Sequence, residues 1–151
     1  MLIRPVTKEE RLQSAQLLTI ESGDLTISDA YDAIHCDYTL QIGAEGTDGP
    51  AISITDCDEG LEAAELHVAS GDNRIRASDD CLNAANSDLS GFDFSMDISG
   101  GTISAYTTDG DGFDSNGSMT ISSGTPPEKP DGGTPPERPD NASEPPEPGN
   151  L

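Results

Sequence analysis

The chain has 151 residues, of which 7 are basic and 29 acidic, so its formal net charge is −22. This charge disfavours direct binding to nucleic acid or anionic lipid, because both require a cationic surface. No segment approaches the roughly 18 uninterrupted apolar residues of a membrane helix, which argues against membrane insertion. Nine of the eleven prolines fall within residues 125–151. Composition therefore predicts one small domain followed by a disordered Pro-rich linker or tail over 125–151.

Residues 1–17 are expected to form a separate N-terminal segment with a short capping helix over 8–16. Thr7 and Glu10 have the spacing of a capping box ahead of a polar stretch. The segment lacks the apolar core of a secretory signal, which leaves a cytosolic protein, or a fragment or mature form of a secreted one. The three cysteines are odd in number and form no CxxC pair. This favours small buried thiols over a disulfide framework or a zinc site.

From residue 18 onward, short stretches alternate apolar and polar residues and are separated by Gly, Ser and Asp, which predicts many short strands. A repeat of an acid, a small residue, a large apolar residue and a polar residue organises them. It reads DAIH at 32–35, EGLE at 59–62, DCLN at 80–83 and DGFD at 111–114. The starts lie 27, 21 and 31 residues apart, which suits one coil of a β-solenoid with loops of variable length.

We therefore predict an all-β fold, a right-handed parallel β-helix of about four to five coils over residues 18–124, with handedness following the general bias of parallel crossovers. The large apolar residues of the repeat would stack inside it as a ladder. These residues are Ile34, Leu61, Leu82 and Phe113.

The acids of the repeat point to a metal. Neighbouring coils lie about 4.8 Å apart, so stacked carboxylates repel by about 3 kcal/mol per pair at an effective dielectric constant near 20. A divalent cation would remove this repulsion, and calcium suits it because calcium accepts about six to eight oxygens in flexible geometry. The alternative is a solvated acidic face without ordered metal. From the residues alone, the candidate metal ligands are Asp32, Asp58, Glu59, Asp79, Asp80, Asn83, Asp109, Asp111 and Asp114.

The succession DAIHCDYTLQI, DEGLEAAELHV, SDDCLNAA and GDGFDSNGSMTISSG, over about residues 18–124, resembles a bacterial carbohydrate-binding family of polysaccharide-lyase-like right-handed β-helices. The resemblance implies calcium as cofactor, acidic plant polysaccharide such as polygalacturonate as partner, and an extracellular or cell-surface location. The chain departs from the family at Ala33 and Cys81, where glycine is expected. The calcium ligands that the resemblance implies are among Asp58, Glu59, Glu62, Asp79, Asp80, Asn83, Asp111 and Asp114.

The number of basic residues helps to distinguish a binding domain from a lyase. β-Elimination on a uronate needs a base, commonly Arg or Lys beside the metal, and the predicted β-helix contains only Arg74 and Arg76. These flank Ile75 and would point outward, where they could pair with ligand carboxylates. Tyr31 and Tyr106 lie near corner motifs, where a ring could stack on a sugar. We predict non-catalytic, calcium-dependent binding of acidic polysaccharide; the alternatives are a pectate-lyase-like enzyme and a structural adhesin module.

Overall fold

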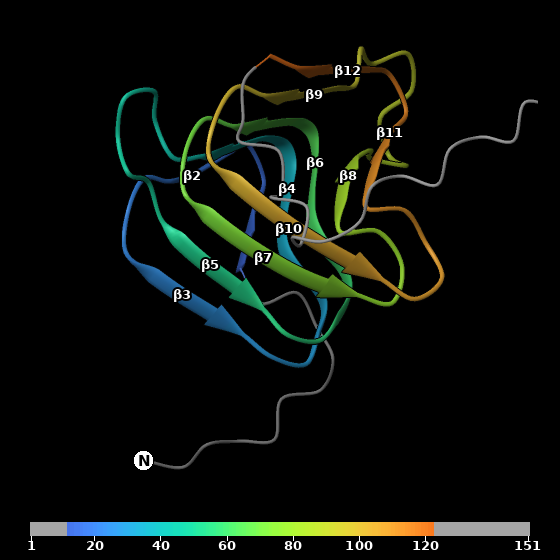
Figure 1. The fold of residues 1–151 in the computed structure, drawn as a ribbon. Helices are drawn as coiled ribbons and strands as arrows, with labels where there is room; N and C mark the ends of the chain where they lie inside the picture. The colour runs from blue at the N-terminus through green and yellow to red at the C-terminus, as the bar shows by residue number, and fades with distance from the viewer. Residues whose placement is uncertain (1–11, 123–151) are drawn as a thin grey trace, which may run out of the picture.

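The computed structural model describes residues 12–122 and shows an all-β protein built from parallel strands (Figure 1). The predicted tail, residues 125–151, lies outside the described residues. Across the described part, no helix has the length and apolarity needed to cross a membrane. The strands are β1 (Leu12–Ser14), β2 (Leu17–Ile20), β3 (Asp24–Ile27), β4 (Ala30–Ile42), β5 (Ala51–Ile54), β6 (Cys57–Val68), β7 (Asp72–Ala77), β8 (Leu82–Ala84), β9 (Ser95–Ile98), β10 (Thr102–Thr107), β11 (Phe113–Ser115) and β12 (Ser118–Ile121).

The strands form two sheets in which every pairing is parallel (Figure 1). The larger sheet has the order β1-β4-β6-β8-β11, with β2, β9 and β12 joined beside this path, and the smaller sheet has the order β10-β7-β5-β3. The long strands β4 and β6 each pair with two shorter strands along one edge. The first part of β4 pairs with β1 and its second part with β2, and in the same way β6 pairs first with β8 and then with β9. The chain therefore returns repeatedly to the same positions. We call each passage a rung: β1–β3, β4–β5, β6–β7, β8–β10 and β11–β12.

The sequence repeat sets the register between rungs. Ile34 pairs with Leu61, Leu61 with Leu82, and Leu82 with Phe113. The first three are fully buried, and Phe113 packs partly buried against the same core. The predicted apolar ladder is thus confirmed. In one rung the repeat requires a small residue at its second position for a steric reason, because a Cβ on Gly60 would collide with the backbone carbonyl of Cys81.

The prediction of a helix over 8–16 is wrong in the part of it that the structure describes. Leu12–Ser14 is strand β1, and Thr7 and Glu10 lie outside the described residues. Leu12 pairs with Ile34 of β4 and packs against the core, so the first rung includes residues before the predicted boundary at 18. Pairing with a long neighbouring strand outweighs the weak helix preference of a short polar stretch.

The cysteines are buried, free thiols, as predicted. Burial raises the pKa of Cys57 to about 12 and also raises the pKa of Cys81. Both side chains therefore stay protonated at neutral pH and act as small apolar groups. Together with Cys36 they belong to the core.

The segment between β8 and β9 folds back over β4. Asn86 Nδ2 donates a hydrogen bond to the carbonyl oxygen of Asp37 at 2.9 Å. The ring of Phe92 packs edge-on against Tyr38, with 6.1 Å between ring centroids. These contacts hold residues of the fourth rung against the second, beside the polar residues described next.

Replacement of one ladder residue should destabilise the fold. Leu61→Ala should lower the free energy of unfolding by about 2–5 kcal/mol, because it leaves a cavity between Ile34 and Leu82. The control Leu17→Ala removes a side chain that is 60% exposed, and it should change stability by about 0.5 kcal/mol or less. Urea denaturation followed by circular dichroism measures both. Equal losses in the two variants would contradict the ladder as the core of the fold.

Candidate functional site

The register stacks the acids of the repeat. Asp32 pairs with Glu59 across β4 and β6. The N–H of Gly60 donates to the carbonyl of Asp80, and the N–H of Cys81 donates to the carbonyl of Asp111, so the column continues through the later rungs. The predicted alignment of the acids is therefore confirmed.

A second polar column runs three residues further along the repeat. His35 pairs with Glu62, Glu62 with Asn83, and Asn83 with Asp114. Each of these residues follows a member of the apolar ladder, so the packing that buries the ladder also fixes the polar side chains at one strand spacing from one another.

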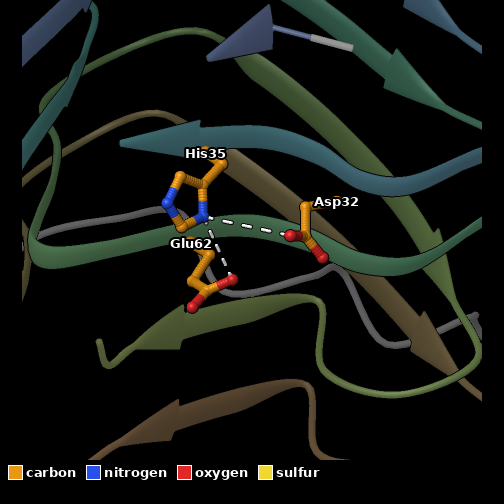
Figure 2. A group of neighbouring side chains, drawn as sticks. All are labelled: Asp32, His35 and Glu62. Carbon is orange, nitrogen blue, oxygen red and sulfur yellow. Dashed lines mark hydrogen bonds and ion pairs between the residues drawn. The ribbon is translucent and has the colours of Figure 1, made fainter. Parts of the chain in front are cut away.

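Three side chains of the two columns meet on β4 and β6: Asp32, His35 and Glu62 (Figure 2). One ligand atom from each lies within 4.8 Å of the other two. His35 Nδ1 is 3.3 Å from Glu62 Oε2 and 4.0 Å from Asp32 Oδ2. The other ring nitrogen, Nε2, is 3.0 Å from Asp37 Oδ1. Within residues 12–122 this is the one such grouping of three His, Cys, Asp or Glu side chains.

The carboxylates favour the charged form of His35. The hydrogen bond to Glu62 raises the pKa of His35 to about 9 against the opposing effect of burial, and Asp37 and Asp32 add to the rise. At neutral pH the ring is therefore an imidazolium that donates from Nδ1 to Glu62 and from Nε2 to Asp37.

Glu59 sits between the cluster and the next rung. Burial, followed by contact with Glu62, raises the pKa of Glu59 to about 8. Burial also acts to raise the pKa of Glu62, but hydrogen bonds from His35 and Glu59 outweigh it and lower that pKa. The two glutamates thus share one proton, held on Glu59. Asn83 Nδ2 donates to Glu59 Oε2 at 3.3 Å.

A hollow of about 370 Å³ lies at the neighbouring corner. Asp58 Oδ1 accepts a hydrogen bond from Ser78 Oγ at 3.0 Å beside it, and Tyr31 is 54% exposed at its wall. The hollow brings four predicted metal ligands together with one predicted sugar contact. Its lining residues are Tyr31, Asp58, Glu59, Ser78, Asp79 and Asp109.

The predicted ligands of the last rungs are arranged more loosely. Asp80 Oδ1 accepts a hydrogen bond from the N–H of Asp111 at 2.7 Å. Burial raises the pKa of Asp80, this hydrogen bond opposes the rise, and the charges of Asp79, Asp114 and Asp111 add to it. In the described part of the chain these carboxylates form no three-residue group comparable to that of Asp32.

The two arginines point outward from β7, as predicted, but on the smaller sheet. Arg74 Nη2 is 3.1 Å from Asp72 Oδ2. The guanidinium of Arg76 lies over the ring of Tyr106, 5.0 Å from its centroid. The two residues are paired across β7 and β10. The structure thus joins Arg76 with Tyr106 and places neither arginine in the lining of the hollow.

Sequence reasoning missed His35 as a metal-ligand candidate. The residue occupies the polar position of the repeat, where the next rungs have Glu62 and Asn83. The available signal was the alignment itself, which places the imidazole directly opposite Glu62. No family model, curated protein or solved structure matches this chain.

Stability should fall as pH rises across the range in which the cluster loses protons. His35 and Glu59 have folded-state pKa values of about 9 and about 8, above their ordinary values of 6.5 and 4.5. The folded protein therefore binds more protons than the unfolded chain, and their contribution, complete at low pH, is lost as pH passes through about 8 and 9. Urea denaturation in metal-free buffer should show the free energy of unfolding decreasing from about pH 6.5 to 9.

The matched variants for this measurement lie on β6. Glu59→Gln mimics the protonated carboxyl and should reduce the slope below about pH 8, leaving the contribution of His35. Glu65→Gln makes the same change elsewhere on the strand and should keep the wild-type slope. A free energy of unfolding that rises between pH 6.5 and 9 in the wild-type protein would contradict the proton balance described above.

Proposed function

We propose that the chain is a non-catalytic domain that binds acidic polysaccharide of the polygalacturonate type through calcium held in the hollow. The observation that carries this proposal is the lining of the hollow, in which carboxylates of Asp58, Asp79 and Asp109 from successive rungs surround one space beside Tyr31. A location outside the cell or on its surface belongs to the same proposal, because such polysaccharides occur there.

The proposal includes a right-handed parallel β-helix as the scaffold. Parallel pairing, the in-register ladder and the return of the first four rungs to the same two sheets support it. Connections between parallel strands of one sheet are right-handed in nearly all proteins. Such a scaffold would present one side chain per rung at each corner, which is how carboxylates distant in sequence come to line one hollow.

Calcium is the ion that this lining favours. The donors are carboxylates and the hydroxyl of Ser78, and calcium takes oxygen ligands in flexible numbers. The protein carries a formal charge of −22 and would repel a polyuronate, so attachment requires a cation that bridges the two anions. Tyr31 offers an exposed ring at the same place for stacking against a sugar.

Absence of catalysis is proposed because the described lining contains acids, a serine and a tyrosine but no strong base. Arg74 is engaged with Asp72, and Arg76 with Tyr106, on the smaller sheet. A pectate-lyase-like mechanism needs an arginine or lysine beside the metal to remove a proton from the uronate. A structural adhesin module, the other alternative, would hold calcium without retaining polysaccharide.

Retention on insoluble polygalacturonate tests the proposal. The wild-type protein should be retained with calcium and released by chelator. Asp79→Asn should weaken retention roughly tenfold at limiting calcium, about 1.4 kcal/mol, with recovery at higher calcium, because one charged ligand is lost. Tyr31→Ala should weaken retention at every calcium concentration. Asp97→Asn on β9 makes the same charge change away from the hollow and should have no effect. Retention that survives chelation would refute the calcium bridge.

Incubation with polygalacturonate and calcium tests the absence of lyase activity. No unsaturated uronates, followed by their ultraviolet absorbance, should form above the rate without protein, because the hollow offers no base of suitable strength. If absorbance rises and Arg74→Ala or Arg76→Ala abolishes the rise, the lyase alternative is correct and the arginine affected is the base.

A further inference from the structure

We propose that Asp32, His35 and Glu62 form a second metal site, distinct from the calcium hollow, that binds a zinc-type transition-metal dication. The three residues come from the two longest strands of the larger sheet, β4 and β6, whose register fixes them opposite one another (Figure 2). Their side chains are 13–17% exposed, so the cluster is mostly buried but still accessible to an ion from solvent.

The distances suit a small tetrahedral ion. Zinc binds nitrogen and oxygen ligands at about 2.0–2.2 Å, so two ligands of a tetrahedral ion lie about 3.3–3.5 Å apart. His35 Nδ1 and Glu62 Oε2 are separated by 3.3 Å, the edge of such a tetrahedron. Asp32 Oδ2 is 4.0 Å from the same nitrogen, about 0.5 Å longer than such an edge, a difference that a small side-chain rotation can remove.

Asp37 supplies a feature that an acidic cluster alone lacks. His35 Nε2 lies 3.0 Å from Asp37 Oδ1, on the side of the ring away from Glu62. A histidine that binds a metal commonly donates its other ring N–H to a carboxylate, which fixes both the tautomer and the ring orientation. Here that contact leaves Nδ1 as the nitrogen that faces Asp32 and Glu62.

A buried amide next to the cluster also supports a metal site. Asn83 is 8% exposed and pairs with Glu62 across β6 and β8. Its Nδ2 donates to Glu59, but its Oδ1 is buried without a hydrogen-bond partner. An unpaired buried oxygen is unfavourable unless a donor, water or cation satisfies it. A hydrated metal ion at Glu62 would provide that partner.

The donor set selects the class of ion. Calcium prefers a shell made of oxygens, whereas an imidazole nitrogen with carboxylates suits zinc and related d-block ions. The hollow offers oxygen donors only, so the two sites differ in the metal they favour although both lie next to Glu59. The site would fasten the second rung to the third.

Cobalt(II) is the probe that tests this site, because it replaces zinc and absorbs visible light when bound by nitrogen and oxygen ligands. The full chain, stripped with chelator, should develop this absorption at one equivalent of cobalt and lose it on addition of zinc. Zinc should also raise the melting temperature of the stripped protein, because it binds the folded chain. Asp79→Asn should leave the cobalt signal unchanged, which separates this test from that of the hollow.

The chain has two histidines, which provide a matched pair of variants. His35→Gln should abolish the cobalt absorption, and His67→Gln should retain it. Asp37→Asn changes a side chain that is 42% exposed, keeps the ligands in place and should weaken zinc binding about 10–100-fold without abolishing it. Absence of the absorption in the folded wild-type protein, or its persistence in His35→Gln, would overturn the proposal and leave the cluster as an ion pair only.

Discussion

The in-register parallel pairing of Ile34, Leu61 and Leu82 is the constraint on which the other features depend. Neighbouring strands lie about 4.8 Å apart, so each residue of a rung faces its counterpart in the next. For the apolar ladder this stacking buries one side chain on another. On either side of the ladder, the same stacking brings acidic side chains close to one another. The register that creates the core therefore also creates the electrostatic strain at the corners.

The rungs relieve this repulsion in two ways. Between β4 and β6, compensation is internal: the imidazolium of His35 faces Glu62, and Glu59 holds a proton at neutral pH. Around the hollow the described lining contains several carboxylates and no cationic side chain, and the proposed calcium would supply the compensation there. The second arrangement is the one that a soluble cation, and through it an anionic polymer, can use.

The repeat of four residues was sufficient to predict the strand register, because its apolar member is also the ladder position. Strand β1 escaped prediction because it lacks the acidic motif, and Leu12 shows its role only once Ile34 is placed beside it. The contact of Asn86 with Asp37 spans 49 residues and has no local signature. His35 was overlooked for a related reason: its chemistry depends on a partner in the neighbouring rung.

Glu59 connects the two candidate sites, since its carboxyl lines the hollow and also contacts the cluster through Glu62. A proton on Glu59 is the form favoured when no metal is present, because burial and the neighbouring carboxylate both oppose its charge. A cation at either site favours the ionised form instead. Ion binding at one site therefore changes the charge that the other site experiences, and linkage makes this influence reciprocal. The sites nevertheless stay chemically distinct, because only the cluster contributes an imidazole nitrogen and only the hollow combines oxygen donors with an exposed aromatic ring.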